Sequence, residues 1–221
     1  MANRIIYIII LLAFSLNLFS QEDDDFAGDG TTKMGFNFGV NYNLIRLSRN
    51  NNSLYSDSVD LINISNSAGY NISMLFYFPI SEKISLKLTP GLVFIRNKIS
   101  YKFKPDGSHK ENLNQTIVPF PLQINYYPLA SKKLYLMAGA SYSLMIGNTD
   151  KLTIHNLELR SNDFELEAGI GFDTFNETVI AGPELKYTFG FLNHIKPSET
   201  MYNDPIKNFG FHRITFSFNF L

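Results

Sequence analysis

The chain has 221 residues, of which 45% are hydrophobic, 14% aromatic and 18% charged, and its formal net charge is −1. A charge this close to zero gives no reason to expect a nucleic-acid partner. The sequence contains no cysteine, which excludes disulfide bonds and a lipid anchor on an N-terminal cysteine.

The N-terminal stretch is typical of a secretory signal. Arg4 precedes the apolar run IIYIIILLAFSLNLF, and Ser20-Gln21 follows it. This run is shorter than the roughly twenty apolar residues of a membrane-spanning helix, which favours a cleaved signal over an uncleaved anchor. We therefore expect a signal peptide over 1–20, a flexible acidic periplasmic lead-in over 21–32 and one β-barrel domain over 33–221.

After this lead-in, apolar residues alternate with small or polar ones at a period of two, which is typical of β-strands. In the first segment Phe36 and Phe38 share one face, and Asn37 and Asn41 share the other. Most segments have about ten residues, the length that a tilted strand needs to cross a bilayer. The pattern predicts eight strands, at 33–44, 69–78, 84–94, 116–126, 134–146, 163–174, 179–189 and 213–221.

Alternation alone also fits a soluble β-sandwich, but the connections favour a membrane barrel. Short links at 79–83, 128–133 and 175–178 alternate with long polar ones at 46–67, 104–114, 148–162 and 192–208. Outer-membrane barrels have short periplasmic turns and long external loops. Tyrosines near the strand ends fit an interfacial girdle: Tyr42, Tyr70, Tyr126, Tyr142 and Tyr187. We predict an all-β fold, an eight-stranded antiparallel transmembrane β-barrel of the bacterial outer membrane, with both termini in the periplasm.

Charged residues within these strands occur in only one of the two registers. The stretch DFELEAGIGFDT illustrates this, because Phe164, Leu166 and Ile170 share a face while the acids share the other. Lipid contact requires an apolar outer register, so the charged register is expected to face a narrow lumen filled by side chains. We interpret these residues as a structural polar network of the lumen: Lys87, Asp163, Glu165, Glu167, Asp173, Glu184, Lys186 and Arg213.

Within that network Glu165 and Glu167 can face Lys87, Lys186 or Arg213 across the interior. They lie about 7 Å apart along one strand face, so an acid/base pair is the alternative interpretation. Buried ion pairs alter pKa values without any catalysis, and the structural interpretation is favoured.

The sequence offers little support for catalysis. Its histidines are His109, His155, His194 and His212, and none has the spacing of a metal-binding pair. His155 or His212 with a loop serine could be a base and nucleophile of a lipid-modifying barrel enzyme, but no G-x-S-x-G element accompanies them. We therefore expect no catalytic, cofactor-binding or metal-binding residues.

Three prolines interrupt the predicted strands. Pro90 lies in the third strand, and Pro119 and Pro121 lie two residues apart in the fourth. Proline has no backbone donor for a β-ladder, and residues i and i+2 face the same neighbouring strand. Two interpretations follow: a weak seam against which a partner strand or helix packs, or a β-bulge that sets local curvature.

Several strand motifs resemble the PorT-type outer-membrane β-barrel family of Bacteroidetes. They are KMGFNFGVNYN, SLKLTPGLVF followed by Tyr101, VPFPLQINYY, YLMAGASYSLMIG, and DFELEAGIGFD continuing through GPELKYTFGFLNHI. The resemblance covers Lys33 to Leu221. That family includes a component of the type IX secretion system, which moves proteins across the outer membrane and supports gliding in some bacteria. The resemblance implies no catalytic residues.

These observations lead to three functional hypotheses. The first is a barrel without an open pore that acts as an accessory or docking component of type IX secretion or gliding, with the lipid bilayer and other secretion proteins as partners. The second is a structural or adhesive barrel that binds an extracellular partner through its long loops. The third is a lipid-modifying barrel enzyme.

Overall fold

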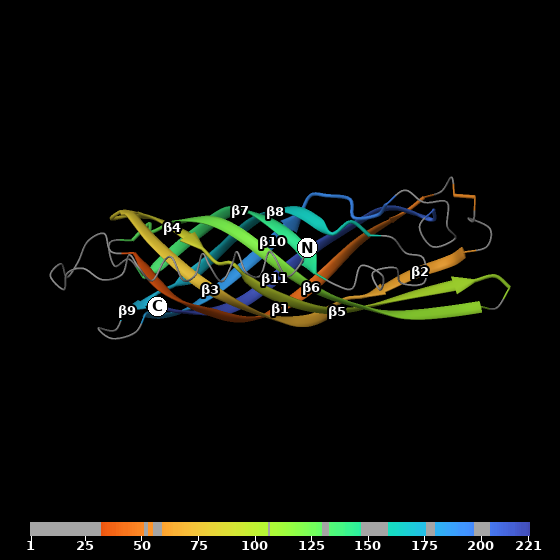
Figure 1. Ribbon diagram of the computed structural model, residues 1–221, viewed down its shortest axis with the longest axis horizontal. Helices are drawn as coiled ribbons and strands as arrows, with labels where there is room; N and C mark the ends of the chain where they lie inside the picture. Colours follow the sequence, from red (N-terminus) through yellow and green to blue (C-terminus); the bar gives the residue numbers. More distant parts are fainter. Residues whose placement is uncertain are drawn as a thin grey trace. The chain divides into compact units, whose positions relative to one another are not determined.

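The computed structural model describes residues 32–50, 53–54, 59–105, 107–129, 133–146, 159–175, 180–196 and 204–221. The expected signal peptide and, except for Thr32, the expected lead-in lie outside these residues. Among the described residues, no helix is long and apolar enough to span a membrane. Their regular structure consists of strands (Figure 1): β1 Lys33–Arg49, β2 Val59–Ser65, β3 Ser67–Ser81, β4 Ile84–Leu88, β5 Gly91–Phe103, β6 Gly107–Tyr126, β7 Leu134–Ile146, β8 Asn162–Phe172, β9 Thr174–Phe175, β10 Ile180–Gly190 and β11 Ile206–Phe220.

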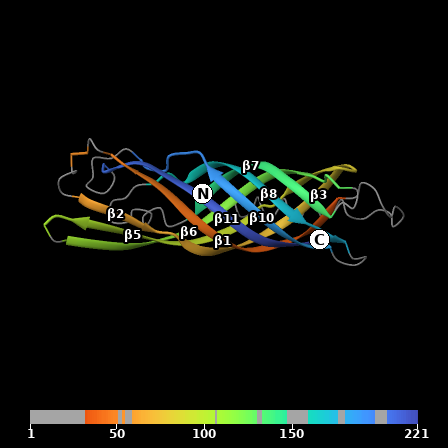
Figure 2. The ribbon, with the colours of Figure 1, turned by 180° about the vertical axis from the view of Figure 1, so that it is seen from behind.

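The strands close into the predicted eight-stranded antiparallel barrel. Closure is made by β1, which pairs with β11 on one side and β3 on the other. Strands β4 and β5 share one place in the wall, because both pair with β3 and with β6. The remaining neighbours follow chain order through β7, β8, β10 and β11, and the wall is seen from behind in Figure 2.

The two registers of each strand have opposite exposure. On β1, Phe36 and Val40 are 55% and 60% exposed, whereas Asn37 and Asn41 are buried. A water-soluble sheet places apolar side chains against its core and polar ones outside, so this barrel is inverted. Its exposed band of Phe, Leu, Ile and Val matches the lipid-facing surface of an outer-membrane barrel.

Tyrosines border this band toward the end of the barrel that lies away from the chain's described termini. Tyr42 is opposite Ile214, which is opposite Tyr187. Tyr70 stacks on Phe94 with ring centroids 4.8 Å apart, and Tyr142 is paired with Phe164. Tyrosine favours the membrane interface because its ring is apolar and its hydroxyl is wet. We call these four tyrosines the outer girdle.

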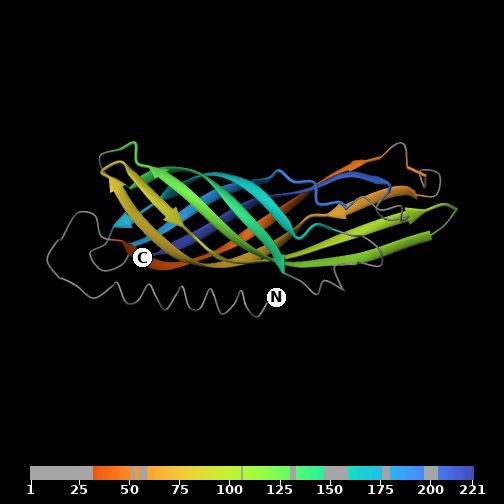
Figure 3. The same cartoon turned by 45° about the horizontal axis from the view of Figure 1, so that its top comes forward.

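Beyond the outer girdle, the long links are more ordered than the sequence indicates. The predicted long link at 46–67 contains β2, which pairs with β5, and the link at 104–114 is largely the start of β6. Strands β5 and β6 pair from Phe103↔Gly107 down to Val93↔Ile117. The result is a three-stranded sheet of β2, β5 and β6 that continues past the barrel wall (Figure 3). Prediction failed here because polar residues alternate in solvent-exposed strands and in loops alike.

The three prolines lie at one level of one seam. The ladder between β4 and β6 ends at Leu88↔Leu122, and that between β5 and β6 begins at Val93↔Ile117. The intervening residues of β6, including Pro119 and Pro121, pair only with β7 in the described ladders. Four residues separate the two ladders on each side of the seam, 89–92 on one strand segment and 118–121 on β6. The register is therefore unchanged across the gap, and the seam contains no β-bulge there. The missing proline donors therefore explain the interruption, as the weak-seam interpretation expects.

We predict that the backbone amides of Thr89, Gly91 and Leu92 exchange with solvent faster than those at 84–88, because the ladder to β6 is interrupted opposite them and this part of the seam opens more readily. Hydrogen exchange of the detergent-solubilised protein measures this difference. The variant P119V/P121V should slow exchange at 89–92 by restoring two donors. Equal protection across both segments in the wild type would contradict a weak seam.

Candidate functional site

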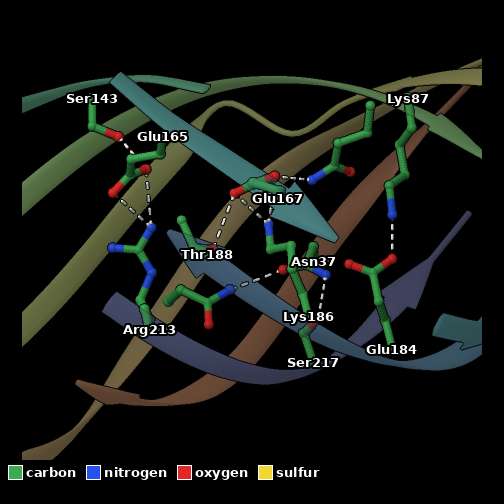
Figure 4. A network of polar contacts seen from close by, with 12 residues as sticks. Asn37, Lys87, Ser143, Glu165, Glu167, Glu184, Lys186, Thr188, Arg213 and Ser217 are labelled. Atoms are coloured by element: carbon green, nitrogen blue, oxygen red, sulfur yellow. Dashed lines mark hydrogen bonds and ion pairs between the residues drawn. The ribbon is translucent and has the colours of Figure 1, made fainter. Parts of the chain in front are cut away.

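The interior of the barrel contains the charged register. Strand β8 contributes three acids at alternate positions, and cations come from the neighbouring strand β10 and from the more distant β11 and β4 (Figure 4). All eight residues of the predicted network lie on the interior side: Lys87, Asp163, Glu165, Glu167, Asp173, Glu184 and Arg213 are buried, and the Lys186 side chain is 14% exposed.

The pair of Lys87 and Glu184 lies toward the end with the short turns. Its two charged groups are in direct contact. The Glu184 carboxylate also accepts hydrogen bonds from the Tyr135 hydroxyl at 2.7 Å and from the Asn219 amide at 3.2 Å. Such additional donors offset the cost of moving a carboxylate out of water. Gly171 faces the Tyr135 ring and has no room for a side chain there, which lets the ring reach Glu184.

Two further pairs occupy the middle of the lumen. Glu167 forms an ion pair with Lys186 at 3.1 Å and accepts a hydrogen bond from Gln123. Glu165 lies 3.3 Å from the Arg213 guanidinium. The Ser143 hydroxyl donates to Glu165 at 2.6 Å. Each of these carboxylates therefore has one cation and at least one neutral donor.

Asp163 differs from the other acids of β8 because its partner is a histidine. The His194 ring, which is completely buried, lies 2.9 Å from the Asp163 carboxylate. That carboxylate also accepts a hydrogen bond from the Leu192 amide at 3.1 Å. The segment after β10 is thereby held against the start of β8. Sequence analysis treated His194 as an isolated loop residue, and no local pattern marks it because Asp163 lies 31 positions away.

The lumen beyond the acids is closed by an apolar cluster. Inward-facing side chains of β5, β6, β7 and β11 pack with Leu159 and Ile195, which form an isolated bridge between two connecting segments. Sequence analysis named only charged residues of the lumen, so this apolar outer half was not predicted. Its members are Val93, Ile95, Ile99, Tyr101, Ile117, Met145, Leu159, Ile195, Ile206, Phe209 and Phe211.

A small polar cavity lies in the middle of the lumen, behind the proline seam. Its volume is about 20 Å³, enough for one water molecule. Glu167, Glu184 and Arg213 line it together with Pro119 and Pro121. Polar side chains thus surround a space for one water molecule at this level of the barrel.

Asp173 lies beyond the end of β8, among the short turns. It accepts a hydrogen bond from the Tyr127 hydroxyl at 2.9 Å. Burial raises the pKa of the Asp173 carboxyl to about 6, although this bond and the nearby Lys87 act in the opposite direction. Burial likewise raises the pKa of the Tyr127 hydroxyl, and so does the neighbouring Asp173 carboxylate.

The histidine that sequence analysis considered as a base lies elsewhere. His212 is on the outer wall, where its Nδ1 is 3.1 Å from the Tyr187 hydroxyl and its ring packs edge-on against Phe189. His155 lies outside the described residues. Among the residues that the structure describes, no group of three or more His, Cys, Asp or Glu side chains is arranged to hold a metal ion.

Comparison with protein families agrees with this geometry. Residues 19–196 match the family described as "Outer membrane protein beta-barrel domain". The chain belongs to this family. An outer-membrane barrel embedded in the lipid bilayer is therefore both its fold and its location.

Solved structures similar to this barrel include the outer membrane protein OprG from Pseudomonas aeruginosa, which has 14% sequence identity and a TM-score of 0.44. The match covers 85% of this chain and 93% of the OprG chain. Neisserial surface protein A has 10% identity over 86% of this chain and 97% of that chain, with a TM-score of 0.38. Likeness at this level carries no functional argument. No curated protein sequence matches the chain.

We predict that Lys87→Met lowers the free energy of unfolding by about 3–5 kcal/mol, because it leaves the Glu184 carboxylate buried without its cation. The double variant K87M/E184M should recover most of this loss. Urea unfolding in detergent micelles, followed by circular dichroism, measures both. Ser85→Ala is a matched control on the same strand, because the Ser85 hydroxyl is buried without a hydrogen-bond partner in the described structure. Equal losses in the single and double variants would contradict a coupled pair.

Asp173 gives a second prediction, which concerns pH. Its pKa is raised from 3.8 to about 6 in the folded protein, so the protonated form is favoured by folding. The stability that this group contributes is present below about pH 4 and is lost as the pH rises through 6. Asp173→Asn should therefore be more stable than the wild type at pH 8, by about 3 kcal/mol at most.

The same unfolding experiment, repeated from pH 8 to pH 4, tests this sign. The difference between wild type and D173N should shrink as the pH falls through 6. Comparing the two proteins at each pH cancels the titration of the other lumen carboxylates. A difference that grows toward acidic pH would show that Asp173 is stabilised as the carboxylate.

Proposed function

We propose that this chain is an outer-membrane barrel without an open pore, which acts as an accessory or docking component in protein secretion. The observation that carries this proposal is the filled lumen. Ion pairs occupy its middle, and an apolar cluster fills its outer half. A cavity of about 20 Å³ leaves no path for a solute larger than water.

In this proposal the eight charged residues have a structural role. Each described acid inside the wall has its own partner: Lys87 for Glu184, Lys186 for Glu167, Arg213 for Glu165 and His194 for Asp163. The Lys87–Glu184 pair joins β4 to β10, which are not neighbours in the wall, whereas the Lys186–Glu167 pair joins the adjacent strands β10 and β8. None of these pairs opens onto a cleft where a substrate could bind, so the acid/base interpretation of Glu165 and Glu167 has no geometric support.

The docking surface is the sheet of β2, β5 and β6 beyond the outer girdle. In the described ladders β2 pairs only with β5, and β6 pairs with β7 only from Thr116 onward. Both outer edges of this sheet therefore lack a strand partner among the described ladders, although the Arg49 side chain of β1 donates to the Val59 carbonyl at 2.6 Å. An exposed strand edge can pair with an extended segment of another protein. A role in type IX secretion or gliding is supported by the resemblance of the strand motifs to PorT-type barrels.

A second candidate is an adhesive barrel that binds an extracellular partner through the same sheet. It is favoured by Leu61, which is 48% exposed at the outer edge of β2. An exposed apolar side chain beside an unpaired edge suits a protein contact. A third candidate, a lipid-modifying enzyme with His212 as base, has less support because the His212 ring packs among Tyr187, Phe189 and Arg46.

The test is complementation of a deletion strain with a trimmed protein. The variant replaces Lys102–Ser108 with an Asn-Gly turn between the paired residues Tyr101 and His109, which shortens the β5–β6 hairpin and keeps the register of the remaining ladder. We expect the deletion to reduce secretion of type IX cargo and gliding speed, and the trimmed variant to restore neither. Its presence in the outer membrane is checked by its heat-dependent mobility on gels.

The outcomes separate the candidates. Normal secretion and gliding with loss of surface attachment would favour the adhesive barrel over the secretion component. Reduced uptake of small sugars as the only defect would contradict a closed lumen and both docking roles. A defect that His212→Ala reproduces in full would favour the enzyme.

A further inference from the structure

The outward face of β5 changes from apolar to cationic at the outer girdle. Leu92 is in the lipid-facing band, and Phe94 stacks on Tyr70 of the girdle. The next outward residues on the same strand are Arg96, Lys98, Ser100 and Lys102, and the three basic ones are exposed. Successive outward residues on a strand lie about 7 Å apart, so one continuous surface joins hydrocarbon contact to positive charge.

This surface gathers cations from two strands. Lys110 of β6 pairs with Ser100 of β5. Lys98 and Lys102 of β5 pair with Asn112 and Ser108, which lie two residues to either side of Lys110. Diagonal neighbours of this kind are about 7–8 Å apart, within reach of long side chains. Two acids belong to these strands, Asp60 of β2 and Glu111 of β6, and their side chains lie outside the described residues. None of these cations forms a hydrogen bond or ion pair through its side chain with another described residue.

Polar groups that suit an anion flank the row. Ser65 of β2 pairs with Lys98, and Asn114 of β6 pairs with Arg96. Both Ser65 and Asn114 are exposed, and cross-strand partners point to the same side of a sheet. Arg96 and Lys98 are therefore accompanied by neutral hydrogen-bonding side chains at the level where lipid headgroups meet water.

We propose that the outward face of β5 binds one lipid with a phosphorylated headgroup in the outer leaflet. Its acyl chains lie along Leu92, Phe94 and their neighbour Ile72, and its phosphates contact Arg96 and Lys98. The continuity of the lipid-facing register with the basic row favours an amphiphile over a soluble anion or an acidic protein. A soluble partner would gain nothing from the apolar half of the surface. This inference is independent of the proposed role in secretion.

The experiment titrates the detergent-solubilised mature protein with diphosphoryl lipid A and counts bound lipid by native mass spectrometry. The variant R96Q/K98Q should bind about tenfold more weakly, because each basic residue near an anionic surface contributes roughly a fivefold factor before screening. The variant R160Q/K207Q is the matched control. It removes the same charge from two exposed positions away from β5, namely Arg160 in the segment before β8 and Lys207 in β11, and it should bind like the wild type.

Three arms identify the ligand. The same lipid with both phosphates removed should lose the preference for wild type over R96Q/K98Q. Inorganic phosphate and soluble polyglutamate at equal charge should not displace the lipid, and displacement by either would overturn the proposal in favour of that ligand class. Equally weakened lipid binding in R96Q/K98Q and R160Q/K207Q would show a general effect of charge and would overturn the proposal. Unchanged lipid affinity in R96Q/K98Q would overturn it as well. Heat-dependent gel mobility confirms that each variant is folded.

Discussion

The hydrocarbon core of a membrane offers the polypeptide backbone no hydrogen-bond partner, and the rest of this structure depends on that constraint. A sheet can satisfy every backbone group only by closing on itself. Closure by β1 with both β3 and β11 achieves this. It also leaves one register of every strand against lipid, so Phe36, Val40 and their counterparts are exposed while the asparagines between them are buried.

The inverted arrangement places the polar side chains in a space too narrow for bulk water. Charges there need partners, because an isolated buried carboxylate is strongly destabilising. The barrel meets this need with acids concentrated on β8 and β10 and with cations from β4, β10 and β11. In its outer half, apolar side chains occupy the described interior, and His194 binds Asp163 beside them. The described interior thus has a charged middle and an apolar outer half.

Two departures from regular pairing give the barrel its individual features. At the prolines, the wall keeps its register while ladder bonds between β6 and the strand beside it are missing. Beyond the outer girdle, β2, β5 and β6 form a sheet with a basic outward face, and its outer edges have no strand partner among the described ladders. The first departure lies next to the internal cavity, and the second carries the two proposed contacts, with a partner protein and with a lipid headgroup.

The alternation of the sequence, together with its alternately short and long links, indicated a membrane barrel, because a period of two decides which side chains share a face. It therefore also indicated which charged residues share one side of the wall. It could not decide which of them meet. Lys87 and Glu184 are 97 positions apart, and their contact depends on strand tilt and stagger, which are set by closure of the whole barrel. The partnership of Asp163 with His194, the apolar outer lumen and the extended sheet were likewise decided only in three dimensions, because they arise between segments whose local patterns carry no information about one another.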